Sequence, residues 1–209
     1  MKMPTTKSLA TALALALCVT AAVPARSRAE FIISVQEVGA DVVVNGSGSA
    51  NLSALTLVSR QSYDAIIFPS GPGLLVGAAG VQAADDYQSI FGPGSFGTGG
   101  FAMATSGSGQ RFGLNALSST QLLLDVPRDY VSGTALSSTS TYVGKTFASL
   151  GLTPGTYQYT WGAGATADSM TILVVARAVP EPASLSLALL GGLFWIGCGV
   201  RRRWARTTG

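Results

Sequence analysis

Histidine is absent from the chain, and cysteine occurs only twice, as Cys18 and Cys198. Lys145 is the single lysine between Arg28 and the C-terminus. Between the two cysteines, these shortages exclude zinc sites of the Cys/His type, thiol nucleophiles and histidine general bases. Of the usual nucleophile–base pairs, a Ser-Lys dyad is the one that this composition still allows. No S-x-x-K pattern surrounds Lys145, so we interpret Lys145 as a solvated lysine. We expect no cofactor and no metal site.

Basic charge is also scarce in the middle of the chain. Residues 30–179 carry five basic and nine acidic side chains, so the net charge of +3 comes from the two terminal segments. No run of Lys or Arg in the middle region could follow a phosphate backbone. The composition therefore excludes nucleic acid as a partner, although the chain as a whole is basic.

A signal peptide is predicted over residues 1–29. Lys2 and Lys7 precede an uncharged stretch at 8–23, and small residues follow at the spacing that a signal peptidase accepts. Cleavage is expected after Ala29, with Ala25 as the alternative, because strand-like sequence then follows directly. The predicted partners of this segment are the secretion translocon and signal peptidase.

Residues 179–209 have the order of features that is typical of a sorting tail. The prolines of Val179-Pro180-Glu181-Pro182 keep that segment extended, because proline fixes φ and has no N–H donor. An uncharged run follows from Ala183 to Val200; its ~18 residues, at 1.5 Å per residue, reach about 27 Å, enough for a thin bilayer. By the positive-inside rule the arginines after this run hold its end in the cytoplasm: Arg201, Arg202, Arg203 and Arg206.

This order of Pro-Glu-Pro, short hydrophobic span and terminal arginines resembles the PEP-CTERM sorting signal of Gram-negative bacteria that make exopolysaccharide. The resemblance implies that an exosortase, a membrane-embedded cysteine protease, recognises Val179 to Pro182 and removes the tail during export. It implies a transient inner-membrane anchor, then delivery to the cell surface or extracellular matrix. A permanent single-pass anchor without cleavage is the alternative.

Residues 30–178 are predicted to form one secreted all-β domain, a jelly-roll-like β-sandwich. Glycine, serine and threonine are abundant there, and short β-branched runs alternate with turn residues. Residues 31–35 and 41–44 predict a hairpin that turns around Gly39. We expect a helical turn over 83–90. The glycine-rich stretch 92–109 is interpreted as a surface loop with one short strand.

The end of this domain has the clearest strand pattern. Tyr157, Tyr159 and Trp161 alternate with polar residues, which is the period of a half-buried strand. Together with Gly162 and the Asp168-Ser169 strand start, they resemble a hairpin common at the end of PEP-CTERM ectodomains. The aromatic stripe has two interpretations. It is core, which we favour, or a glycan-binding face, since aromatic rings stack on sugar rings.

The acidic residues are the remaining candidates for chemistry. Asp85-Asp86 is the only adjacent pair, and Asp125 and Asp129 flank Pro127. No calcium-loop spacing is present, so we interpret Asp85-Asp86 as part of a solvated face. No pattern selects the two carboxylates of a glycosidase. We expect a structural or adhesive protein of the exopolysaccharide or biofilm and not an enzyme; a carbohydrate-binding module and a secreted glycan-active hydrolase are the alternatives.

Overall fold

The computed structural model describes residues 30–118 and 121–175, and in these ranges the chain is mostly β-strand with almost no helix. The predicted signal peptide and sorting tail lie outside the described residues. Two sheets, one of six strands and one of seven, form the domain. The prediction of an all-β domain is therefore confirmed for the described part.

The six-stranded sheet has the order β12-β13-β1-β2-β11-β8. Its strands are β1 (Glu30–Val38), β2 (Asp41–Gly48), β8 (Ser106–Ser108), β11 (Leu136–Tyr142), β12 (Gly155–Trp161) and β13 (Asp168–Val175). The predicted hairpin is confirmed as β1 and β2, which pair antiparallel from Phe31 to Val38 around a positive-φ Gly39. β1 pairs on its other side with β13, in parallel.

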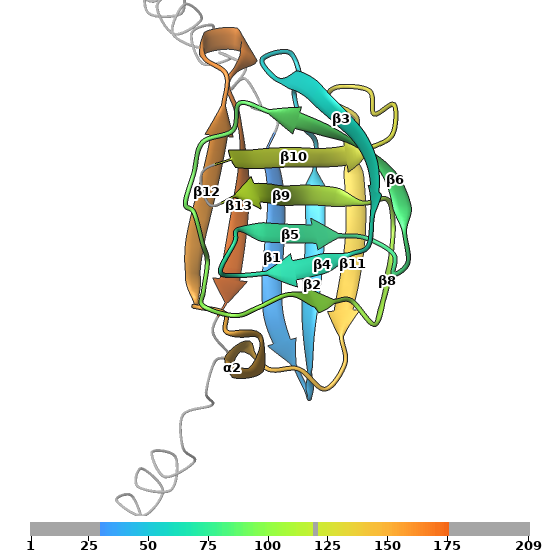
Figure 1. Ribbon diagram of the computed structural model, residues 1–209, viewed down its shortest axis with the longest axis vertical. Helices are drawn as coiled ribbons and strands as arrows, with labels where there is room; N and C mark the ends of the chain where they lie inside the picture. The colour runs from blue at the N-terminus through green and yellow to red at the C-terminus, as the bar shows by residue number, and fades with distance from the viewer. Residues whose placement is uncertain (1–29, 119–120, 176–209) are drawn as a thin grey trace, which may run out of the picture.

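The parallel pairing of β1 with β13 separates the two ends of the described chain. Glu30 lies opposite Ser169, and Gln36 lies opposite Val175, so both strands run in the same direction. The described chain consequently starts at one end of this sheet and finishes at the other, as Figure 1 shows. A parallel pair cannot be closed by a short turn, so this contact needs the whole intervening chain.

The seven-stranded sheet has the order β3-β6-β10-β9-β5-β4-β7. Its strands are β3 (Thr56–Tyr63), β4 (Ile66–Phe68), β5 (Gly73–Val76), β6 (Gln82–Gln88), β7 (Ala102–Met103), β9 (Phe112–Ser118) and β10 (Gln121–Pro127). The helical turn predicted over 83–90 is wrong. That segment is β6, whose backbone is held on both sides, by β3 and by β10.

The seven-stranded sheet is strongly curled. Four strands separate β3 from β4 in the sheet order, yet only Asp64 and Ala65 link them in the sequence. Two residues cannot cross four strands that lie about 4.8 Å apart, so the sheet must bend to bring the two together. Figure 1 shows β3 curving around the ends of its neighbours to reach β4.

The core lies between the two sheets, whose strands cross at a steep angle in Figure 1. Phe31 of β1 and Phe112 of β9 meet there, with ring centroids 3.8 Å apart. Burying each large apolar side chain contributes about 1.5–3 kcal/mol. The remaining fully buried members come from both sheets and include Ile33, Val35, Val42, Val44, Ile67, Leu74, Val76, Leu114, Leu124, Val126, Met170 and Ile172.

A short helix, α2 (Phe147–Leu150), and the glycine-rich stretch cover one end of the core. Thr146 caps the helix, and Gly151 ends it with φ +63°. The amides of Thr98 and Gly99 donate to the Gly151 carbonyl at 2.8 and 3.2 Å. A Cβ on Gly99 would lie 1.7 Å from the Leu150 carbonyl oxygen, so two backbones meet where no side chain fits. The prediction for 92–109, a loop with one short strand, holds in part, because two short strands, β7 and β8, lie in this stretch.

Replacing Gly99 by alanine should destabilise the domain, because the new methyl group would push the loop away from α2. We expect a loss of about 1–3 kcal/mol, the usual cost of inserting carbon into a packed site. Urea unfolding followed by tryptophan fluorescence measures it. Gly100→Ala is the matched control, since a Cβ there meets nothing within 4 Å. Equal effects of the two substitutions would contradict this account of the glycine-rich stretch.

Candidate functional site

The predicted aromatic stripe is part of the core. Tyr159 and Trp161 are 0% and 2% exposed, and Tyr157 is half-buried with its hydroxyl donating to the Thr153 carbonyl. The stripe faces inward because β12 pairs with β13, whose Met170 and Ile172 point to the same side. The favoured interpretation is confirmed. A glycan face made of Tyr157, Tyr159 and Trp161 is wrong, because two of the three rings have no surface to offer a sugar.

Trp161 and Asp168 fasten a loop to the end of the six-stranded sheet. The two residues are register partners on β12 and β13. The Trp161 indole Nε1 donates to the Asn51 carbonyl at 2.8 Å, and the Asn51 amide donates to Asp168 Oδ2 at 2.6 Å. Asn51 is thus held at both of its backbone groups. The Trp-Gly and Asp-Ser elements of the hairpin have a structural role in this chain.

Truncating Trp161 should therefore destabilise the domain strongly. Trp161→Ala removes a buried ring and the bond to the Asn51 carbonyl, and we expect the free energy of unfolding to fall by about 3–5 kcal/mol. Thr160→Ala is the control, since Thr160 is the exposed neighbour on the same strand and its side chain contributes within about 0.5 kcal/mol. A Trp161→Ala protein as stable as the control would overturn the assignment of this ring to the core.

The outer side of the six-stranded sheet is a broad surface of hydroxyl and amide groups, called here the hydroxyl face. One register row crosses all six strands: Thr156, Leu173, Ser34, Asn45, Thr139 and Ser108. The rows on either side add further exposed or half-buried polar members: Gln36, Ser47, Ser137, Thr141, Gln158 and Thr160. Neighbouring strands lie about 4.8 Å apart, so these groups form a regular array.

Charge is confined to the two ends of the hydroxyl face. Glu30 lies at one end and accepts a hydrogen bond from Thr171 Oγ1 at 3.0 Å. Asp41 lies at the other end and accepts from the Gly144 amide at 2.8 Å. Between them the described strands present uncharged polar side chains with a few aliphatic ones, of which Ile32 is 40% exposed. Such a surface can exchange hydrogen bonds with a partner that is rich in hydroxyl groups.

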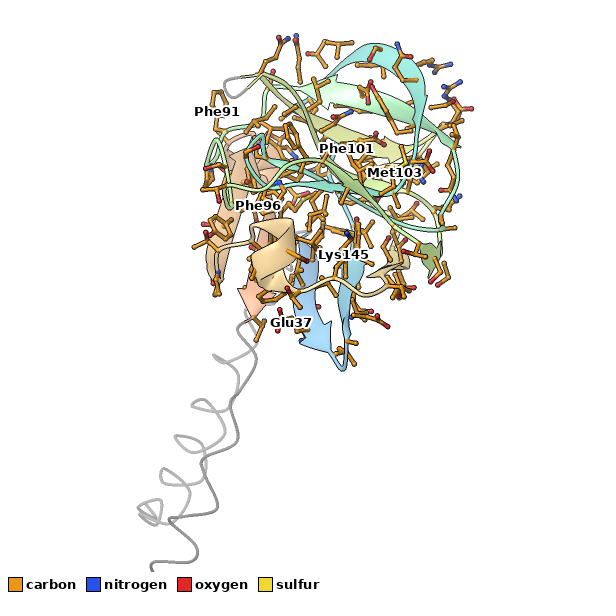
Figure 2. The ribbon with its side chains drawn as sticks, turned by 60° about the horizontal axis from the view of Figure 1, so that its bottom comes forward. Glu37, Phe91, Phe96, Phe101, Met103 and Lys145 are labelled. Atoms are coloured by element: carbon orange, nitrogen blue, oxygen red, sulfur yellow. The ribbon has the colours of Figure 1, made fainter. Side chains whose placement is uncertain are left out.

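Several large apolar side chains are exposed on loops and on the edge strand β7. Phe91, Phe101 and Met103 are 70%, 55% and 59% exposed. Figure 2 shows Phe101 and Met103 near each other and Phe91 apart from them. The Phe91 backbone exchanges two hydrogen bonds with Thr160, at 3.0 and 2.8 Å, and thereby covers part of the open edge of β12. Lys145, also labelled in Figure 2, is exposed, as predicted.

The Asp85-Asp86 pair is buried, so its interpretation as a solvated face is wrong. The exposed fractions are 2% and 0%, because β6 lies inside the curled sheet between β3 and β10. Asp85 forms an ion pair with Arg128 Nε at 2.8 Å and a longer one with Arg60 Nε at 3.5 Å. The amide of Asp129 also donates to it. This carboxylate is compensated by the charges around it.

Asp86 points to the opposite side of β6, where a second carboxyl group lies beside it. Ser59 Oγ donates to Asp86 Oδ2, and Tyr63 OH donates to the same oxygen at 3.0 Å. Burial and this bond to Asp86 raise the pKa of Tyr63. Asp125 of β10 is the register partner of Asp86 and is fully buried. Neither carboxyl reaches solvent, so this pair lends the hydrolase interpretation no support.

Sequence reasoning missed this carboxyl pair, although one signal was present. Asp125 stands inside an apolar run, between Leu124 and Val126, where a carboxylate is unusual unless it is buried and functional or paired. The partner was not readable, because the β6–β10 register depends on contacts distant in sequence. No three acidic, cysteine or histidine side chains of the described ranges are placed to hold a metal ion.

The other predicted site residues lie outside the described residues. They are the processing motif Val179, Pro180, Glu181 and Pro182, the signal cleavage position Ala29, and the arginines Arg201, Arg202, Arg203 and Arg206. Among residues 30–118 and 121–175, helix length and hydropathy nowhere suffice to cross a membrane. Comparison of the chain with protein-family models, curated proteins and solved structures finds no match.

Proposed function

We propose that the chain is an exported protein, processed by an exosortase, with a structural or adhesive role at the cell surface or in the exopolysaccharide of a biofilm. The observation that carries this proposal is the tail, with Val179 to Pro182, the run from Ala183 to Val200 and the terminal arginines in order. The signal peptide and translocon take the chain into the membrane, and the tail holds it there until it is cut.

The two predicted cuts flank the described strands and would spare them. β1 (Glu30–Val38) lies after the predicted signal cleavage at Ala29. β13 ends at Val175, four positions before Val179, so a cut near Pro180 would leave every described strand whole. The two sheets of the domain are the part of the predicted fold for 30–178 on which this proposal depends. The jelly-roll-like order of strand connections stays a prediction.

Mass analysis of the exported protein tests both cuts at once. We expect an N-terminus at Glu30 and a C-terminus close to Pro180, so that Trp204 is absent from the product. The control is the same chain with Pro180 and Pro182 replaced by alanine, which should keep its tail. A native surface protein that still contains Trp204 would instead show a permanent anchor, and the exosortase proposal would fail.

We propose that the hydroxyl face is the surface that contacts the matrix. Its array of hydroxyl and amide groups is free of charge between Glu30 and Asp41, and this chemistry suits an uncharged, hydroxyl-rich polysaccharide. The aromatic stripe cannot make this contact, because Tyr159 and Trp161 are buried. Many weak hydrogen bonds over a broad area suit a structural role better than tight binding of one small sugar.

A lysine in the middle of the hydroxyl face should reduce retention in the matrix. We expect Asn45→Lys to lower the fraction of protein that sediments with purified exopolysaccharide several-fold, since a charged side chain must be desolvated on contact. Gln61→Lys is the matched control, because Gln61 is an exposed amide on β3 of the other sheet. Thermal unfolding should be similar for both variants. Equal retention of the two would argue against this face.

A further inference from the structure

Asp86 and Asp125 form a buried carboxyl pair across two neighbouring strands. They are register partners in the antiparallel pairing of β6 with β10, and both are 0% exposed. Register partners point to the same side of a sheet, with Cβ atoms about 4.5–5.5 Å apart. Two ionised carboxylates at this separation and out of water would repel each other strongly.

The hydrogen bonds around the pair are unequal. Asp86 Oδ2 accepts from Ser59 and Tyr63, while Asp86 Oδ1 has no partner. Both oxygens of Asp125 are without a hydrogen-bond donor. Donors stabilise the ionised form of the carboxylate that receives them, so the negative charge belongs on Asp86. Asp125 is the member on which a charge would be uncompensated.

Among the described residues, Arg111 is the cation whose charge acts on Asp125, and its Nε and Nη1 have no hydrogen-bond partner. Arg111 is 1% exposed, and its Nη2 donates to the carbonyls of Ala78 and Gly80. Within the described residues no ion pair within 4 Å joins Arg111 to Asp125. Arg60 and Arg128 face Asp85 on the other side of β6.

Among the described residues, the other titratable groups whose charges act on this pair or on Arg111 are Tyr63, Asp64, Asp85 and Tyr142, and none of them is a cation.

We propose that Asp86 and Asp125 share one proton, with Asp125 kept as a neutral acid that donates to Asp86 Oδ1, and that the fold loosens when this proton is lost. The O–H of Asp125 would satisfy the free oxygen of Asp86 and remove the repulsion. Asp86 also accepts hydrogen bonds from Ser59 and Tyr63 of β3. The pair would therefore hold the curled strand β3 against β6 and β10. The domain would then be most stable in acidic surroundings.

The direction of the pH effect follows from linkage. Burial raises the pKa of Asp125 well above its usual range; the charge of Asp86 adds to this rise and Arg111 opposes it. Above the ordinary aspartate pKa of about 3.9, the folded state therefore holds a proton that the unfolded chain has released. The unfolding constant rises by up to about tenfold per pH unit, until Asp125 ionises in the folded state.

The test compares the exported wild-type protein with its Asp125→Asn variant, whose amide cannot ionise. Unfolding constants are measured in urea between pH 5 and 8. We expect the wild-type constant to rise more steeply with pH than the variant's, by up to about tenfold per unit. Burial also raises the pKa of Asp168, but this residue is present in both proteins, so its effect on the slope cancels in the comparison. Asp129→Asn, at an exposed carboxylate, should keep the wild-type slope.

An Asp125→Asn protein with the wild-type slope would overturn the proposal. If that variant fails to fold, carboxyl carbon NMR of the wild-type protein decides: Asp125 still protonated at pH 6 supports a shared proton, and titration below pH 5 overturns it. A bound cation would also overturn the proposal, since it would take the place of the shared proton. In that case millimolar Ca²⁺ would lower the wild-type unfolding constant severalfold, EDTA would raise it, and the Asp125→Asn variant would respond to neither.

Discussion

The pairing of the first described strand with the last is the constraint on which the rest of the domain depends. β1 lies between β2 and β13, and its Phe31, Ile33 and Val35 are fully buried. No cysteine occurs between residues 30 and 175, so no disulfide ties the ends together. The β1–β13 hydrogen bonds do so instead. They form only when the intervening chain has brought β13 alongside, which makes both sheets part of one cooperative unit.

The curl of the seven-stranded sheet follows from a second constraint, the two-residue link between β3 and β4. Bending the sheet to meet this link encloses side chains on its outer surface that would otherwise face water. Asp86, Asp125 and Arg111 are polar groups in such positions. The fold thereby creates an interior polar cluster separate from the apolar core between the sheets. A small sandwich usually lacks such a cluster, because polar groups are costly to bury.

Local patterns in the sequence predicted the features that depend on neighbouring residues. The β1–β2 hairpin and the inward stripe of Tyr159 and Trp161 follow from alternation and turn chemistry. The burial of Asp85 and Asp86 did not, because adjacent acids in isolation are usually solvated and only the β3–β6–β10 register encloses them. The hydroxyl face could not be predicted from the sequence either, since its rows combine strands that lie far apart in the chain. The proposed processing sites rest on sequence alone.

The direction of β13 has a mechanical consequence. β13 leaves the described domain at the end opposite to the start of β1, and it is bonded along its length to β1 and to β12. A tether attached beyond Val175 would pull β13 along its own axis. The bonds to both neighbours would then be loaded together in shear, whereas a strand pulled sideways from an edge loses its bonds one at a time. A domain built in this way resists tension that is applied through its C-terminal end.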